Sequence, residues 1–196
     1  EQAENFFRKI GITFNVYGEE AADERLIPFD VVPRVLSGNE WRKLSKGIEQ
    51  RVRAINAFLY DIYHRQEILR AGRVPRSLIA NNAAFLPMMM GFDPPGGIYT
   101  HIIGTDIVRT GPDEFYVLED NARTPSGVSY MLENREIMLQ MFPELFADIP
   151  ICEVSDYPSW LRRSLSACAP AACLDKPTVA VLTPGVFNSA YFEHSF

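Results

Sequence analysis

The sequence has 196 residues, of which 47% are hydrophobic and 22% are charged. This composition predicts a globular core, in one ordinary domain or in one and a half small ones, and excludes a fibrous or disordered chain. The net charge of −6 provides no basic footprint, so we expect no nucleic-acid partner. The sequence contains neither an apolar run of membrane-spanning length nor a secretory signal pattern. We therefore expect no membrane partner and a cytoplasmic location.

The clearest predicted element is a long helix at Ser37–Ala71. Ser37 and Glu40 have the spacing of a capping box, and apolar residues then recur every three or four positions. Gly72 follows where a C-cap glycine belongs. The apolar stripe predicts core packing rather than a cofactor site.

Shorter elements are predicted on both sides of this helix. Proline, glycine and asparagine interrupt residues 73–97, and runs of β-forming residues follow. We expect an extended run at Leu26–Val35, helices at Phe6–Ile10, Ser77–Ala80, Ser129–Phe142 and Trp160–Ala169, and strands at Ile98–Ile103, Asp106–Arg109 and Phe115–Asn121.

The last part of the sequence predicts the start of a βαβ unit. Thr178–Leu182 has the pattern of a buried strand, and a Pro-Gly turn and the opening of a helix follow it. The second strand of such a unit would lie beyond Phe196. We therefore expect this chain to be the N-terminal part of a longer protein.

The three cysteines, Cys152, Cys168 and Cys173, match no zinc motif and no disulfide framework. The three histidines show no ligand spacing around them. We expect reduced thiols that bind no metal.

The second and third β-runs predict a hairpin that ends in Glu-x-Asn-x-Arg. If Gly111–Glu114 form a four-residue turn, Thr110 pairs with Phe115 and Asp106 lies opposite Glu119. A register shifted by one residue would separate the two carboxylates, so this prediction depends on the length of the turn.

In this register Asp106, Glu119 and Asn121 share one face of the hairpin, because side chains alternate along a strand. Two carboxylates and an amide oxygen are hard donors of the kind that magnesium prefers, and substrate phosphates usually complete its coordination. The spacing therefore predicts a magnesium site. Two other interpretations stay open: a surface hairpin without a ligand, and a hydrolase with Asp106 and Glu119 as its acid and base.

The residues after the hairpin favour phosphate chemistry. Arg123 is a planar bidentate donor suited to phosphate, while Ser126, Gly127 and the following helix N-terminus offer backbone N–H groups to an anion. A metal site, an arginine and an anion-binding turn suit phosphoryl transfer. We predict a catalytic role for Arg123 and nucleotide contacts at Ser126 and Gly127.

Gly-x-Asp followed by Phe-Tyr-Val-Leu-Glu-Asp-Asn-Ala-Arg-Thr-Pro-Ser-Gly resembles the metal-binding hairpin of the ATP-grasp ligases. The wider sequence is similar to the circularly permuted ATP-grasp type 2 proteins, relatives of glutathionylspermidine synthase. The similarity runs from about Phe29 to the end, and the segments that carry it are 29–35, 50–63, 96–101, 127–135 and 188–194.

This resemblance implies an α+β fold that is a fragment of a circularly permuted ATP-grasp fold. It implies a long helix near the N-terminus, an antiparallel metal-binding hairpin and the start of a Rossmann-like pre-grasp unit. The implied segments are an N-terminal segment at 1–36, an ATP-grasp portion at 37–150, and a linker with the truncated Rossmann-like unit at 151–196. The lysines that grip the nucleotide would lie beyond Phe196.

The resemblance also implies a function, a carboxylate–amine ligase that depends on ATP and Mg²⁺ and proceeds through an acylphosphate. Asp106, Glu119 and Asn121 would hold two magnesium ions on ATP, and Arg123 would lie near the transferred phosphate. The expected partners are ATP and a small carboxylate, amine or peptide substrate, and the main alternative is a non-catalytic binding scaffold. We expect the isolated chain to be inactive and to bind ATP weakly or not at all.

Overall fold

The structure is a computed structural model that describes residues 2–14, 25–26, 28–188 and 190–196. The described residues form helices and two antiparallel two-stranded sheets, a mixed composition consistent with the predicted α+β class. The chain divides into two compact units, Glu1–Val35 with Ser126–Ser166 and Cys173–Phe196, and Leu36–Pro125 with Ala167–Ala172. The predicted division at 1–36, 37–150 and 151–196 stays a prediction.

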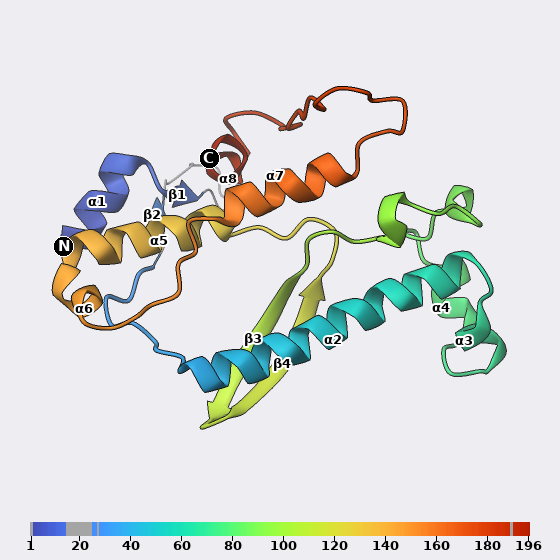
Figure 1. Ribbon diagram of the computed structural model, residues 1–196, viewed down its shortest axis with the longest axis horizontal. Helices are drawn as coiled ribbons and strands as arrows, with labels where there is room; N and C mark the ends of the chain where they lie inside the picture. The colour runs from blue at the N-terminus through green and yellow to red at the C-terminus, as the bar shows by residue number, and fades with distance from the viewer. Residues whose placement is uncertain (1, 15–24, 27, 189) are drawn as a thin grey trace. The chain divides into compact units, whose positions relative to one another are not determined.

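The first unit has a small core where α1 and α5 meet (Figure 1). Phe7, Ile12 and Ile137 are its fully buried side chains. The unit contains α1 (Gln2–Ile10), β1 (Thr13–Phe14), β2 (Arg25–Leu26), α5 (Val128–Met141), α6 (Pro143–Ala147), all but the last residue of α7 (Tyr157–Ala167), and α8 (Tyr191–Ser195).

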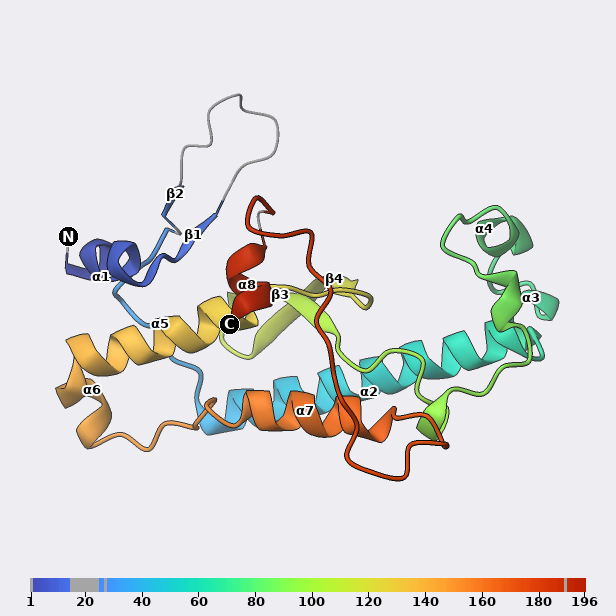
Figure 2. The same ribbon diagram turned by 90° about the horizontal axis from the view of Figure 1, so that it is seen from above.

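The second unit is built on the long helix α2, which runs along one face of a β-hairpin (Figure 1). Two short helices lie at the far end of α2, as both views show (Figure 2). Its elements are α2 (Gly38–Tyr63), α3 (Glu67–Arg70), α4 (Arg76–Ala80), the 3₁₀ turns η1 (Pro87–Met89) and η2 (Pro95–Gly97), β3 (Gly104–Gly111) and β4 (Glu114–Asn121).

The predicted capping box at the start of α2 is confirmed. The Ser37 Oγ accepts from the backbone N–H of Glu40 at 3.2 Å, and the Glu40 carboxylate accepts from the Ser37 N–H at 2.9 Å. These bonds, together with the nearby Arg109 guanidinium, lower the pKa of Glu40. The helix therefore begins where the sequence indicated.

The predicted end of this helix at Ala71 is wrong, because α2 stops at Tyr63. The carboxylate of Asp61 accepts from the backbone N–H groups of Glu67 and Ile68, at 2.8 and 2.9 Å. Those donors begin α3, a separate short helix. A side chain that caps new backbone donors competes with continuation of the helix.

Gly72 does end a helix as predicted, but the helix is α3. Its φ is +65°, its N–H donates to Leu69, and the next N–H, of Arg73, donates to the carbonyl of Ile68. This pair of bonds is a Schellman motif, whose left-handed residue favours glycine.

The predicted strand at Ile98–Ile103 is wrong, since β3 begins only at Gly104. The side chain of Asn56 on α2 accepts the backbone hydrogen bonds that a neighbouring strand would otherwise accept. Its Oδ1 accepts from the N–H groups of Tyr99 and Thr100, at 2.8 and 3.1 Å. A local side-chain partner satisfies these backbone groups without a sheet.

The predicted buried strand at Thr178–Leu182 is also wrong in this structure. The segment is neither strand nor helix, and Leu182 is 94% exposed. Among the described residues only β1–β2 and β3–β4 pair, so this segment has no ladder partner. A helix of five residues, α8, follows the predicted turn, and the Rossmann-like unit itself stays a prediction.

The other predicted helices are present with shifted ends, as α1, α4, α5 and α7. Of the predicted extended run Leu26–Val35, residue 26 belongs to β2 and residues 28–35 are irregular, while residue 27 lies outside the described residues.

Candidate functional site

The β3–β4 hairpin places Asp106 opposite Glu119, as the sequence predicts. The neighbouring pair is Thr105 with Asp120, and Gly104 pairs with Asn121. The carboxylates at 106 and 119 are therefore direct cross-strand neighbours at the open end of the hairpin.

The route to this register differs from the predicted one. The turn is shorter than expected, because Gly111 pairs with Glu114. Thr110 is then an extra residue on β3, so its predicted pairing with Phe115 is wrong; Phe115 pairs with Arg109. A second irregularity makes Leu118 an extra residue on β4. Each bulge shifts the register by one residue, and the two shifts cancel before Asp106 is reached.

Asp106, Glu119 and Asn121, which we call the oxygen triad, are all exposed. The Asn121 Nδ2 donates to the Glu119 Oε1 at 3.2 Å, so these two side chains touch. Asp106 makes no side-chain hydrogen bond or ion pair with any part of the chain that the structure describes. Two unneutralised carboxylates facing one another repel, and a cation relieves that repulsion.

The donor set of the triad fits a hard cation such as Mg²⁺. Among the described residues no three His, Cys, Asp or Glu side chains gather into a metal site. The triad has two such residues, and its third donor is an amide. The magnesium site is therefore compatible with the structure and stays a prediction.

The opposite face of the hairpin carries the groups that attach it to α2. Asp120 accepts from the Arg51 Nε at 2.6 Å and from the Thr105 hydroxyl at 3.0 Å. Because adjacent side chains on a strand point to opposite faces, Glu119 and Asn121 point away from α2.

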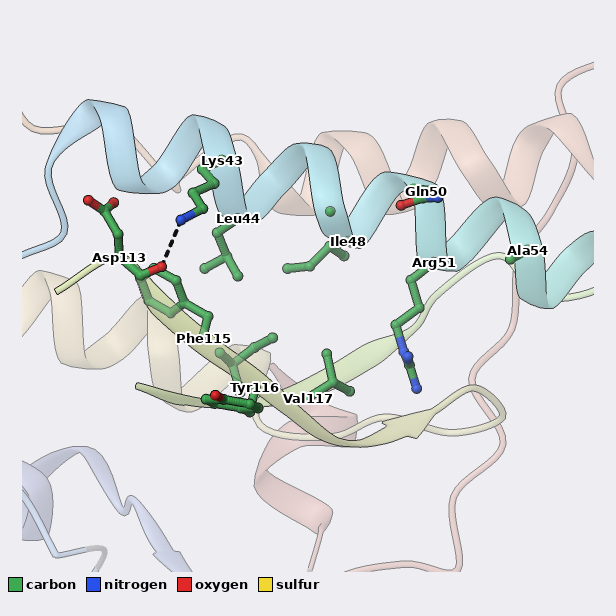
Figure 3. Close-up of a pocket in the computed structure, with 12 residues that line it drawn as sticks. Lys43, Leu44, Ile48, Gln50, Arg51, Ala54, Asp113, Phe115, Tyr116 and Val117 are labelled. Atoms are coloured by element: carbon green, nitrogen blue, oxygen red, sulfur yellow. Dashed lines mark hydrogen bonds between the residues drawn. The ribbon is translucent and has the colours of Figure 1, made fainter. Parts of the chain in front are cut away.

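The turn end of the hairpin is attached to α2 by a second set of contacts. Arg109 forms an ion pair with Glu40, and Lys43 donates to the backbone carbonyl of Asp113 at 2.8 Å. A hollow of about 480 Å³ lies between these two elements. Figure 3 shows Leu44 and Ile48 of α2 facing Phe115 and Val117 across it. Apolar side chains line part of this hollow, which lies on the face of the hairpin that is turned away from the triad.

The segment after β4 is held near Gly104. A Cβ at Gly104 would lie 2.8 Å from the Cβ of Pro125, closer than side chains approach. The Thr100 hydroxyl also donates to the backbone carbonyl of Ala122, at 2.6 Å. Arg123, between these two anchors, is exposed and makes no hydrogen bond or ion pair with the described residues. Its predicted catalytic role stays a prediction.

The predicted anion-binding turn does bind an anion, which belongs to the chain itself. The Gly127 and Val128 N–H groups each donate to the Glu193 Oε1 at 3.1 Å. The Ser129 N–H donates to Oε2 at 3.2 Å, and the Ser129 hydroxyl donates to the same oxygen. Ser126 is exposed. The nucleotide contacts predicted at Ser126 and Gly127 stay predictions, and in this structure Glu193 already uses the Gly127 donor.

Glu193 also affects two nearby phenols. Burial raises the pKa of Tyr130 and of Tyr157, and the negative charge of Glu193 raises both further. Sequence reasoning did not identify Glu193, because more than sixty residues separate it from the donors it binds. Its only signal was its place in the 188–194 segment that carries the family resemblance; residue 189 of that segment lies outside the described residues.

Two further polar clusters were also not identified from the sequence. The Cys168 Sγ lies 3.3 Å from the His101 Nε2, although 67 residues separate them. The His64 imidazole faces the Tyr60 carbonyl at 2.9 Å and the Asp93 carboxylate at 3.2 Å. None of the three cysteines is part of a disulfide among the described residues.

Comparison with known proteins places these features in a family. The family model described as circularly permuted ATP-grasp type 2 matches residues 33–196. An uncharacterized protein of Synechocystis sp. is 48% identical over 196 residues, which is all of this chain and 40% of that protein. An uncharacterized protein of Mycobacterium tuberculosis is 50% identical over 185 residues, which is 94% of this chain and 33% of that protein.

A protein of Frankia casuarinae named "Putative glutamate--cysteine ligase 2-2" is 41% identical over 185 residues, or 94% of this chain and 21% of that protein. This chain thus spans well under half the length of these relatives. No helix among the described residues has both the length and the apolar character that crossing a bilayer requires.

Proposed function

Because this chain belongs to the circularly permuted ATP-grasp type 2 family, we propose that it supplies the metal-binding part of a ligase that joins a carboxylate to an amine at the expense of ATP. The observation that carries the proposal is the register of the hairpin. Asp106 and Glu119 are direct neighbours, and Asn121 touches Glu119 on the exposed face.

The proposed reaction has two steps. A carboxylate oxygen of the substrate attacks the γ-phosphorus of ATP, which breaks the bond to ADP and forms an acylphosphate. The amine nitrogen then attacks the acyl carbon, inorganic phosphate leaves, and the nitrogen loses a proton to give an amide. Positioning and neutralisation of charge provide most of the catalysis in such a transfer.

The residues of this chain have distinct roles in the proposal. Asp106, Glu119 and Asn121 hold Mg²⁺, which neutralises charge on the nucleotide phosphates when it is bound. Arg123 donates to the phosphoryl group as it moves, a role that its exposed, bidentate guanidinium can fill. The residues that grip the nucleotide would come from a part of the protein outside this chain. The requirement for ATP suggests action in the cytoplasm.

The names of the Frankia relatives suggest a substrate class to test first. The protein of Frankia casuarinae and a protein of Frankia alni named "Putative glutamate--cysteine ligase 2-3" are 41% and 42% identical to this chain. We propose that the activated group is a carboxylate of an amino acid, with glutamate as the first candidate, and that the amine also belongs to an amino acid.

One observation favours a second candidate, a non-catalytic scaffold of the same fold. The N–H groups of Gly127, Val128 and Ser129, which the ligase proposal offers to a ligand, all donate to Glu193. If that contact is permanent, the turn serves stability rather than catalysis.

Trapping the acylphosphate would test the ligase proposal. The protein in its full natural length is incubated with ATP, Mg²⁺, glutamate and hydroxylamine, and both hydroxamate and ADP are measured. We expect hydroxamate formation that depends on ATP and is lost in Asp106→Ala and Glu119→Ala. Asp113→Asn is the matched control, because it changes a carboxylate of the same hairpin outside the triad.

A different result would overturn the proposal. If nucleotide turnover persists in Asp106→Ala and Glu119→Ala, the metal assignment is wrong. If other amino acids and peptides in place of glutamate also give neither ADP nor hydroxamate, the scaffold is the better description. Bond cleavage without nucleotide would instead indicate the hydrolase.

A further inference from the structure

We infer that Arg51 and Asn56 of α2 are positioning residues for the oxygen triad. The inference rests on the proposed function, because it gives these side chains a role only through Asp106, Glu119 and Asn121. Neither residue touches the triad. Arg51 binds Asp120 directly, and Asn56 acts on Ala122 through Thr100.

Arg51 acts through Asp120, which lies between Glu119 and Asn121 in the sequence. The Arg51 Nε donates to the Asp120 Oδ2 at 2.6 Å, and the Thr105 hydroxyl donates to Oδ1 at 3.0 Å. Asp120 is 12% exposed, while Arg51 is 46% exposed. The carboxylate is therefore held on both oxygens, on the face toward α2.

This contact selects the register of the strand. The bulges at Thr110 and Leu118 show that β3 and β4 pair with offsets that differ by one residue. A slip of one residue would turn Asp120 away from α2 and would turn Glu119 and Asn121 toward it. The ion pair with Arg51 forms only when Asp120 faces the helix. In that register both β4 members of the triad face outward.

Asn56 acts on the other side of the triad. Its Oδ1 accepts from the Tyr99 and Thr100 N–H groups, and its Nδ2 donates to the Thr100 carbonyl at 3.4 Å. Thr100, which is 7% exposed, donates its hydroxyl to the carbonyl of Ala122 at 2.6 Å. Ala122 directly follows Asn121, so this chain of bonds fixes where the strand ends.

The two contacts thus hold the strand on both sides of Asn121. One fixes the side chain of Asp120, and the other fixes the backbone of Ala122. Outer groups that orient metal ligands commonly change metal affinity by about 10- to 100-fold when they are removed. We expect an effect of about 10-fold from either anchor.

A second contact between α2 and the hairpin provides a control for general loosening of the helix. Arg109 and Glu40 also pair α2 with the hairpin, but at its turn end. Breaking this pair loosens the helix from the hairpin without touching a neighbour of the triad. A purely structural role for Arg51 predicts equal effects at both ends, while a positioning role predicts an effect at Arg51 alone.

The experiment measures Mn²⁺ binding, as a spectroscopic substitute for Mg²⁺, by electron paramagnetic resonance on the protein in its full natural length with ATP present. We expect Asp106→Asn to abolish the bound signal. Arg51→Met, Asp120→Asn and Asn56→Ala should weaken binding about 10-fold, and Arg109→Met should bind as the wild type does.

Thr100 provides a pair of variants of nearly equal size. Thr100→Val removes the hydroxyl and should weaken Mn²⁺ binding about 10-fold. Thr100→Ser keeps the hydroxyl and should restore wild-type binding. Circular dichroism on each variant confirms folding. Should Arg51→Met not fold, Asp120→Asn decides the Arg51 contact, because it is isosteric and keeps the acceptor for Thr105; should Asn56→Ala not fold, Thr100→Val decides the other.

Failure of the inference is distinct from failure of the proposed function. If Asp106→Asn leaves Mn²⁺ binding unchanged, the metal site itself is wrong. If Asp106→Asn abolishes binding while Asp120→Asn and Thr100→Val bind normally, the positioning inference is overturned and the metal site stands. Equal weakening by Arg109→Met and Asp120→Asn also overturns it, in favour of general loosening.

Discussion

Two regions of this molecule carry groups that could bind a charged ligand. They differ in how many of those groups already have a partner within the chain. The oxygen triad on β3–β4 presents two carboxylates and an amide, and among the described residues no cation contacts them. The N-terminus of α5 presents three backbone N–H groups and a hydroxyl, and Glu193 accepts from all of them.

The difference indicates which region is the better candidate for a ligand from outside the chain. The triad places two exposed carboxylates opposite one another, and among the described residues neither is paired with a cationic side chain. Donors at a helix N-terminus that already contact a carboxylate gain little from a second anion. The triad is therefore the stronger candidate for ligand binding, and the α5 terminus is the stronger contributor to stability.

The largest expected effect tests the first half of this comparison. Asp106→Asn should weaken Mg²⁺ binding at least about 100-fold, because a hard cation loses one of two charged donors. In metal-free buffer the same variant should be as stable as the wild type or slightly more so, since a repulsion is removed. Calorimetry with Mg²⁺ and thermal unfolding in a chelator measure the two effects. A marked loss of stability without metal would contradict the comparison.

The second effect tests the other half. Glu193→Ala should lower the free energy of unfolding by about 2–3 kcal/mol, because it removes a charged cap and leaves several half-buried donors unpaired. Glu193→Gln keeps one acceptor oxygen and should cost less. Urea denaturation measures both, with the exposed Glu153→Ala as the control, expected to change stability by less than about 0.5 kcal/mol. Equal costs for Glu193 and Glu153 would refute the cap.

The third effect concerns the segment that connects the two regions in the sequence. Gly104→Ala should cost about 1–3 kcal/mol, because its Cβ would overlap Pro125 and force residues 122–125 to move. Gly47→Ala is the matched control. A Cβ there meets nothing within 4 Å, and the helix should gain about 1 kcal/mol. Denaturant titration of both variants should therefore give changes of opposite sign.

The smallest effect concerns Glu40, which, like Glu193, is a carboxylate whose hydrogen-bond partners belong to the chain itself. Its hydrogen bonds to Ser37 lower its pKa in the folded state. A lowered pKa stabilises the fold above the ordinary pKa of the carboxyl, and that contribution disappears as the pH falls through the lower folded value. The wild type should therefore lose stability more steeply than Glu40→Gln as the pH falls below 4.5. Identical pH profiles for the two proteins would show that this carboxylate contributes nothing.

The sequence was sufficient for features set by near neighbours. The capping box at Ser37 and Glu40 requires only a spacing of three residues, and the Schellman glycine at Gly72 requires only the helix before it. The facing of Asp106 and Glu119 was also predicted, but from a turn that was too long and without either bulge. Because the register shifts of the two bulges cancel, the prediction of the pair was correct although it included neither bulge.

The features that the sequence could not provide depend on distant side chains. Asp61 ends α2 by capping α3, Asn56 replaces a strand partner for Tyr99 and Thr100, and Glu193 fills the α5 terminus. None of these pairings leaves a periodic or local signal, because each partner is chosen by the fold. The prediction for Thr178–Leu182 was wrong for the opposite reason. The local pattern of this segment suits a strand, but no described segment pairs with it.

The paired bulges at Thr110 and Leu118 also determine how this hairpin can change length during evolution. A single insertion or deletion between Asp106 and Glu119 would normally change which residue faces Asp106. Here Thr110 and Leu118 are extra residues without a cross-strand partner, so deletion of either one removes its bulge and leaves Asp106 opposite Glu119. Relatives that keep the site should therefore tolerate single deletions at these two positions, and not at the paired positions between them.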